Sequence, residues 1–316
     1  LRPYGGVRKQ GIHMRFSGHE TFHLRDGWLH KGLELLIQKP AALVGPNAAD
    51  WLGVGLNMAR SIRHWLQVTG LAQLGEKGKS GPRGMIPTEL GQLIFERDPY
   101  FLDPGTLWAL HANLVSGAQA GSWYWFFNFF NLTRFEREVC LENLRQFLQL
   151  RRIKLPAHTT LERDLQCMLA SYAQPVPPKY EDPEEEPYCP FVDLDLLRHY
   201  RSSGHYEINR ELKSVPFELV GYSLAQAFTS VSQGTGQADI RLEEAQRQPG
   251  APGRVFALSP ETLFDTLLAA EYECGGKALH ISGLAGERAI RVICRSPIQW
   301  LQDYYTRMEK EEKHAA

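Results

Sequence analysis

The chain has 316 residues, of which 43% are hydrophobic and 22% charged, with a formal net charge of −1 at pH 7. This composition is typical of a folded protein rather than a disordered one, and the length favours more than one domain. The near-zero charge excludes a generally basic nucleic-acid-binding protein, so any contact with DNA needs a local basic patch.

The five cysteines are odd in number and scattered, without a close pair. Their spacing argues against a disulfide framework and against a cysteine zinc site. The chain also has no apolar run near the roughly 20 residues that span a bilayer, and its start does not resemble a signal peptide. We therefore expect a cytoplasmic protein without membrane association. We interpret residues 1–13 as a disordered extension and Met14 as the native start.

The segment from Phe16 to Leu29 concentrates reactive side chains between glycines and aromatic residues. Its sequence His19-Glu20-Thr21-Phe22-His23 matches the motif of a zinc metalloprotease helix. The longer form of that motif also requires a glycine and a histidine further along the chain. Here both residues are one position away from where the motif requires them. Ser17-Gly18 also predicts a turn rather than a helix before the first histidine. We therefore expect no zinc at this segment.

Residues 14–98 have the pattern of a winged helix-turn-helix domain. Helical spacing covers residues 26–38, 47–52 and 55–69, and short strands at 71–74 and 85–87 flank a basic glycine-rich loop before a further helix at 88–95. In such a domain the second helix of the motif enters the major groove, and loop cations contact phosphates. The alternative is a protein-interaction module whose polar helix face is simply solvated. The predicted DNA contacts are Asn57, Arg60, His64 and Gln67 on the helix, with Lys77, Lys79 and Arg83 in the loop.

Residues 99–173 read as a helical region packed on that domain. Its most aromatic stretch, residues 122–130, could stack on unpaired bases, but we interpret it as core because aromatic side chains dominate burial. Residues 174–190 combine six prolines with a run of carboxylates. The carboxylates raise the possibility of a metal site, but the prolines favour a stiff, solvated acidic linker.

Residues 191–316 read as a second, α+β domain. We predict helices at 192–200, 216–231, 261–270 and 297–313, a strand at 254–258, and a hairpin from 278–281 and 288–293. The fold class is therefore mainly α with small β hairpins, that is, α+β. The chain contains no complete phosphate-loop or dinucleotide-binding motif, so we expect no nucleotide cofactor.

Several sequence motifs in the first half of the chain indicate a family resemblance. They are Phe16-Ser17-Gly18-His19-Glu20-Thr21-Phe22, Arg25 with Gly27-Trp28-Leu29, Leu52-Gly53-Val54-Gly55, Asp98-Pro99-Tyr100 with Asp103-Pro104-Gly105-Thr106-Leu107-Trp108, and Trp123-Tyr124-Trp125-Phe126-Phe127-Asn128. With these words the sequence resembles the bacterial family that accompanies DNA phosphorothioation genes, including the SspB-like nickases of single-strand phosphorothioation systems. The resemblance implies a cytosolic protein that acts on double-stranded DNA together with other phosphorothioation proteins. It also implies nicking of one strand, so that sulfur can replace a non-bridging phosphate oxygen.

Hydrolysis of a phosphodiester requires an activated water, a charge partner for the phosphate and a proton for the leaving oxygen. His19 could act as a base or a metal ligand, Glu20 or Asp26 could hold a divalent ion such as Mg²⁺ or Mn²⁺, and Arg25 could clamp the phosphate. The alternative is that His19, Glu20 and Arg25 form a buried polar network that locks the N-terminal segment in place. A non-catalytic DNA-binding subunit that recruits the sulfur-transfer machinery is a further alternative.

Overall fold

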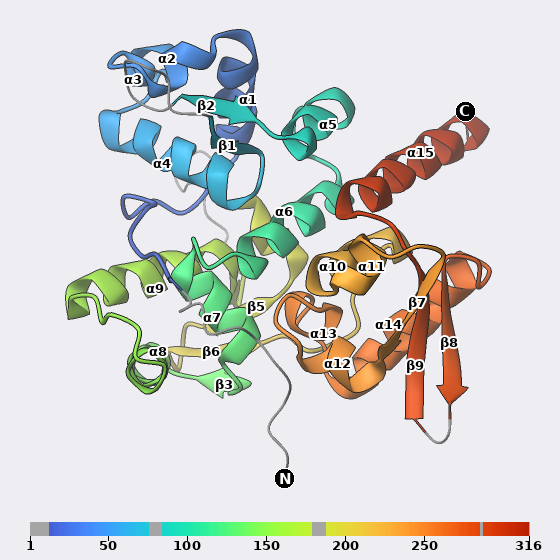
Figure 1. Ribbon diagram of the computed structural model, residues 1–316. Helices are drawn as coiled ribbons and strands as arrows, with labels where there is room; N and C mark the ends of the chain where they lie inside the picture. The colour runs from blue at the N-terminus through green and yellow to red at the C-terminus, as the bar shows by residue number, and fades with distance from the viewer. Residues whose placement is uncertain (1–12, 76–83, 179–187, 285–286, 316) are drawn as a thin grey trace.

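The computed structural model describes residues 13–75, 84–178, 188–284 and 287–315 (Figure 1). The fold is α+β, as predicted, and within these ranges the helices are accompanied by three small sheets. None of the helices in these ranges combines the length and the apolar character that a membrane crossing requires.

The first unit has the predicted order of helix, turn, helix, hairpin and helix. The faces of α1 and α4 meet through fully buried side chains, among them Leu33, Ile62 and Trp65. Gly53 makes the turn after α3 in the left-handed conformation, which costs a glycine little. The hairpin pairs antiparallel, with Leu74 opposite Met85. The elements are α1 (Trp28–Gln38), α2 (Pro40–Val44), α3 (Ala48–Leu52), α4 (Leu56–Val68), β1 (Ala72–Leu74), β2 (Met85–Pro87) and α5 (Glu89–Arg97).

The second stretch is helical and carries the aromatic core. Asp103 caps the first of its helices by accepting hydrogen bonds from the N–H groups of Gly105, at 2.7 Å, and Thr106, at 3.2 Å. Trp123 and Trp125 are almost completely buried, which confirms the interpretation of the aromatic stretch as core. The elements are α6 (Pro104–Ser116), α7 (Gly121–Phe129), β3 (Arg134–Phe135), α8 (Arg137–Leu150) and α9 (His158–Tyr172).

The start of the predicted acidic linker is a strand instead. Strands β4 (Ala173–Val176), β5 (Leu197–Tyr200) and β6 (His205–Ile208) join β3 in a sheet of order β3-β6-β5-β4, with β4 parallel to β5. Pro175 is tolerated because β4 is an edge strand. The helix predicted at 192–200 is wrong, since a 3₁₀ turn (Pro190–Leu194) and β5 occupy it. Residues 179–187 of the predicted linker lie outside the described residues.

The last stretch combines six helices with a three-stranded antiparallel sheet of order β7-β9-β8 in the described ranges. The strand predicted at 254–258 is wrong, because Pro252 begins a short helix there. The other predicted elements are present, although the helix predicted over 216–231 breaks at Phe228. The elements are α10 (Phe217–Ala227), α11 (Thr229–Ser232), β7 (Gln237–Arg241), α12 (Leu242–Arg247), α13 (Pro252–Val255), α14 (Pro260–Glu273), β8 (Leu279–Leu284), β9 (Glu287–Ile293) and α15 (Pro297–Ala315).

Aromatic and ionic contacts join the last stretch to the earlier helices. The Trp108 ring of α6 meets the Phe256 ring edge-on at a centroid distance of 5.1 Å. Helix α15 returns to the first unit, where Arg97 of α5 forms an ion pair with Glu309 (Figure 1). Buried side chains from all the described ranges belong to one hydrophobic cluster.

Candidate functional site

The segment from Phe16 to Leu29 is a turn followed by an extended approach to α1. Ser17, Glu20 and Thr21 have positive φ angles of 60°, 49° and 68°, which disrupt any helix. Helix α1 begins only at Trp28, after both histidines of the segment. The predicted turn is confirmed, and the two histidines do not share a helix face.

His19 is the buried centre of this segment. Its side chain is 1% exposed, and its Nε2 lies 2.9 Å from Oδ1 of Asp164 on α9, which is itself 2% exposed. Its Nδ1 accepts the N–H of Thr21 at 3.1 Å, so in the neutral ring Nε2 carries the hydrogen and donates it to the carboxylate. The N–H of Ser17 donates to the same oxygen at 2.5 Å. The arrangement is a buried hydrogen-bond network that ties the segment to α9.

His64 lies against this network rather than on the surface. A Cβ added at Gly18 would stand only 2.4 Å from Nδ1 of His64, so the segment passes directly over this face of α4. Burial, followed by the charges of His19 and Arg15, lowers the pKa of His64 to about 3. The prediction that His64 belongs to the exposed reading face of α4 is therefore wrong, because the motif segment covers it.

The exposed face of α4 retains the other predicted residues. Asn57 and Arg60 are exposed, and Nη1 of Arg60 donates to Oδ1 of Asn57 at 3.3 Å. Gln67 is half-buried on the same side. Arg63, which sequence reasoning missed, is one residue before His64 and half-buried; burial and Arg60 lower its pKa. Lys77, Lys79 and Arg83 lie outside the described residues.

The remaining candidates do not converge on one point among the described residues. Glu20 is half-buried, whereas Asp26 is exposed and accepts the N–H of Gly27 with Oδ1 at 2.9 Å. The Arg25 guanidinium lies 5.4 Å from the Phe22 ring centroid and 5.1 Å from that of Trp28. Its Nε is buried without a hydrogen-bond partner in the described ranges. Across the same ranges, His, Cys, Asp and Glu side chains form no group of three or more that could hold a metal ion.

Sequence reasoning also missed Asp164, although the chain contains a signal for it. Leu161, Leu165 and Met168 form the buried stripe of α9, and Asp164 lies on that stripe at helical spacing. A carboxylate on an apolar helix face needs a buried partner, because an unpaired buried charge is costly. That partner is the His19 segment.

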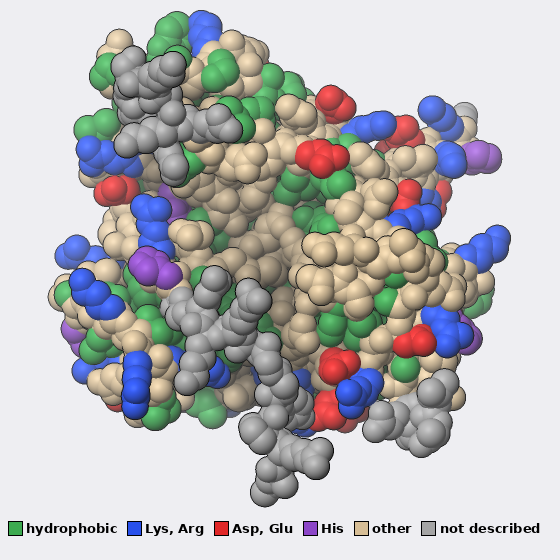
Figure 2. Space-filling model, viewed as in Figure 1, with side chains coloured by type: hydrophobic (Ala, Val, Ile, Leu, Met, Phe, Trp, Pro, Cys, Tyr) green, Lys and Arg blue, Asp and Glu red, His purple; other side chains and the backbone are tan. Residues whose placement is uncertain are grey.

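A basic pocket opens beside the motif segment, between it and the loop that joins α8 to α9. Its volume is about 550 Å³. Figure 2 shows Lys and Arg side chains gathered along the left side of the view, where α4, α8 and α9 lie. No acidic residue lines the pocket among the described residues. The lining residues are His13, Met14, Arg15, Phe16, Ser17, Arg151, Arg152, Ile153, Lys154, Pro156 and Thr160.

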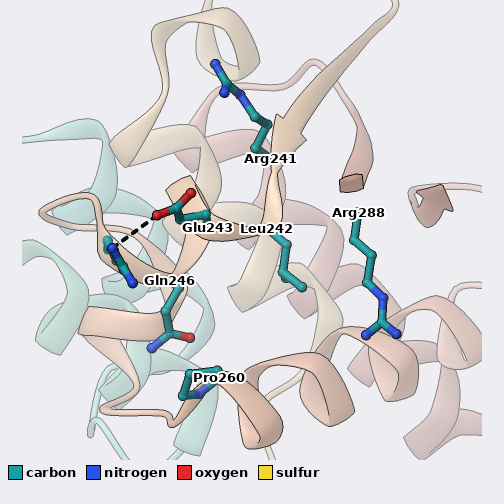
Figure 3. A pocket seen from close by; sticks show the side chains of 7 residues that line it. Arg241, Leu242, Glu243, Gln246, Pro260 and Arg288 are labelled. Atoms are coloured by element: carbon teal, nitrogen blue, oxygen red, sulfur yellow. Dashed lines mark ion pairs between the residues drawn. The ribbon is translucent and has the colours of Figure 1, made fainter. Parts of the chain in front are cut away.

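A second pocket lies between α12, α14 and β9 (Figure 3). Its volume is about 360 Å³, and its lining includes Arg241, Arg247 and Arg288. Here two of the cations are paired with carboxylates: Nη1 of Arg247 lies 3.0 Å from Oε1 of Glu243, and Nη2 of Arg241 lies 3.8 Å from Oε1 of Glu244. This pocket is therefore less suited to a polyanion than the basic pocket.

Two solved structures are similar to the chain over nearly its whole length. One is a magnesium-ion-bound crystal structure of SspB, with a TM-score of 0.79, 25% identity, and coverage of 93% of this chain and 88% of that one. The other is a crystal structure of SspB with the same TM-score and coverage and 24% identity. No curated protein sequence matches the chain.

The resemblance to the SspB-like family is confirmed by these structures. Residues 16–305 match the family described as "Protein of unknown function (DUF4007)". That range includes the motif segment, α4, the basic pocket's α8–α9 loop and the first half of α15. The chain belongs to the DUF4007 family.

Proposed function

We propose that the protein is a DNA-binding component of a phosphorothioation-type modification system, and that it nicks one strand of duplex DNA. The observation that carries the proposal is the similarity to SspB over 93% of the chain. The motif words that prompted the family resemblance lie within the matched range of residues 16–305.

The DNA contact in this proposal is the exposed face of α4. The order α3, turn, α4, β1–β2 hairpin supports the proposal of a winged helix-turn-helix, a motif in which the second helix enters the major groove. Asn57 and Arg60 offer groups of the kind that read base edges, and both are exposed. Arg63 adds a cation near the groove wall.

The nicking residues in this proposal are Glu20 and Arg25, with His19 as a positioning residue. His19 is buried and both of its ring nitrogens are engaged, so it holds the turn that presents Glu20 instead of touching the phosphate. One relative was crystallised with a magnesium ion. Glu20 and Asp26 are the carboxylates proposed for such an ion, but the described residues hold no preformed three-ligand cluster, so we assign no step to a metal.

A non-catalytic DNA-binding subunit is the second candidate, and the burial of His19 favours it. A supercoiled-plasmid assay with added Mg²⁺ or Mn²⁺, run beside a gel-shift assay, separates the two functions. We expect nicking by the wild type, loss of nicking in Glu20→Gln with nearly unchanged DNA affinity, and no effect of Glu312→Gln, a matched change at an exposed glutamate of α15. Binding without nicking would support the second candidate. Neither binding nor nicking would contradict both.

A further inference from the structure

The basic pocket brings together four exposed cations, Arg15, Arg151, Arg152 and Lys154. None of them forms an ion pair with a residue in the described parts of the chain, whereas Arg97, Arg247 and Arg307 elsewhere in those parts do. Like charges gathered without a counterion repel one another. A pocket of this kind is stabilised by an anion from outside the chain.

The contacts that hold these cations in place are not ion pairs, so they do not neutralise the positive charge. The backbone of Arg15 is fixed on both sides, with its N–H donating to Ala118 O at 3.0 Å and its carbonyl accepting the N–H of Gly121 at 2.8 Å. The Arg151 guanidinium lies 5.6 Å from the Phe147 ring centroid. Arg152 follows in a left-handed turn, with φ 55°, that ends α8. The pocket is therefore a defined part of the fold.

The pocket adjoins the face of α4 proposed to contact DNA. Ser17 lines the pocket, and the next residue, Gly18, packs against His64 of α4. Arg15 is close enough to His64 for its charge to lower the pKa of that ring. The pocket therefore lies next to the part of α4 that carries His64, one helical turn beyond Arg60.

We propose that the basic pocket binds backbone phosphates of duplex DNA and extends the contact made by α4. The inference rests on the proposed DNA binding but assigns a separate surface, in which Arg15 and Lys154 position the duplex without reading its sequence. An overall charge of −1 gives the protein no general attraction for DNA, so such a local cluster is needed. The second pocket is unsuited to this role because its Arg247 already forms an ion pair with Glu243.

The test is duplex binding by a double variant, Arg15→Gln with Lys154→Gln, measured by fluorescence anisotropy over a salt series with two duplexes of different sequence. Removing two phosphate contacts should weaken affinity for both duplexes by about tenfold, and should reduce the slope of log K against log salt by about two. Lys310→Gln with Lys313→Gln, the same charge change on exposed α15 residues, should leave both quantities near the wild-type values. Arg15→Lys with Lys154→Arg should restore binding.

The outcomes separate this inference from the proposed function. If the pocket variant binds like the wild type while Arg60→Gln weakens binding, the pocket inference is overturned and DNA binding by α4 stands. If the pocket variant loses calorimetric binding of inorganic phosphate but keeps its duplex affinity, the pocket serves a small phosphorylated ligand and the inference is likewise overturned. If the wild type binds neither duplex, both proposals are wrong.

Discussion

The carboxylate of Asp164 is the acceptor on which the order of the motif segment depends. It receives the imidazole N–H of His19 and the backbone N–H of Ser17 on one oxygen. Its second oxygen is buried without a partner among the described residues. Because Ser17 and Glu20 have left-handed backbone conformations, the turn needs such an anchor to persist.

Asp164→Ala should lower the free energy of unfolding by about 3 to 5 kcal/mol, because it leaves two buried donors without an acceptor. Asp164→Asn is the matched control: its amide oxygen can still accept both hydrogen bonds, so the loss should be clearly smaller. Urea unfolding of the two variants measures the difference. Equal losses would show that the position matters through packing and not through the acceptor.

At the scale of elements, a close helix contact joins α10 to α15. A Cβ added at Gly221 would lie 2.5 Å from Cδ2 of Trp300, whose side chain is fully buried. Only a glycine lets the indole ring lie directly on the backbone of α10. The contact is reinforced by Arg307 of α15, which pairs with the buried carboxylate of Glu218 at 2.6 and 2.9 Å. The returning helix α15 is thereby fixed to the rest of the molecule.

Gly221→Ala should destabilise the protein by about 1 to 3 kcal/mol, because the buried indole has no room to withdraw. Gly283→Ala on strand β8 is the control, since a Cβ there meets no atom within 4 Å. Thermal unfolding of both variants gives the comparison. A Gly221 variant as stable as the Gly283 variant would mean that α15 shifts freely on α10.

At the scale of the whole molecule, His111 connects parts of the chain that are far apart in sequence. It is completely buried on α6, accepts the hydroxyl of Tyr172 from α9 with Nδ1, and donates from Nε2 to the carbonyl of Val255 in α13, both at 2.8 Å. Burial lowers the pKa of His111 to about 4. The neutral ring is therefore part of the shared core.

These pKa shifts predict acid sensitivity. The folded-state pKa values of His64 and His111, about 3 and about 4, are below the ordinary value of 6.5, so the folded state binds fewer protons than the unfolded state. Their stabilising contribution is complete above pH 6.5 and is lost as the pH falls toward 4 and 3. At pH 5 each of these histidines should lower the free energy of unfolding by about 2 kcal/mol relative to its value at neutral pH.

His111→Gln should start from a lower stability but lose less of it between neutral pH and pH 5. His158→Gln, at an exposed position, should keep the wild-type pH dependence. Chemical unfolding at several pH values measures these slopes. An unchanged slope in the His111 variant would show that this ring is not buried in its neutral form.

The sequence by itself determined the local elements and the family. Periodicity placed α1, α4 and α15 within a few residues, because their apolar faces recur at helical spacing. The turn at Ser17-Gly18 followed from local residue preferences in the same way. The short sequence motifs in the motif segment and in the aromatic core were sufficient to identify the family resemblance that the SspB structures confirm.

Tertiary structure alone decided what surrounds those elements. The prolines concealed strand β4 in the sequence, because its pairing with β5 depends on residues 24 positions further along the chain. His64 has the spacing of an exposed residue but is covered by Gly18, a contact between segments that no local pattern encodes. The partner of His19 is 145 residues away. Burial is a property of the assembled core, so the sequence named the chemical groups of the candidate site and only the fold determined which of them reach the surface.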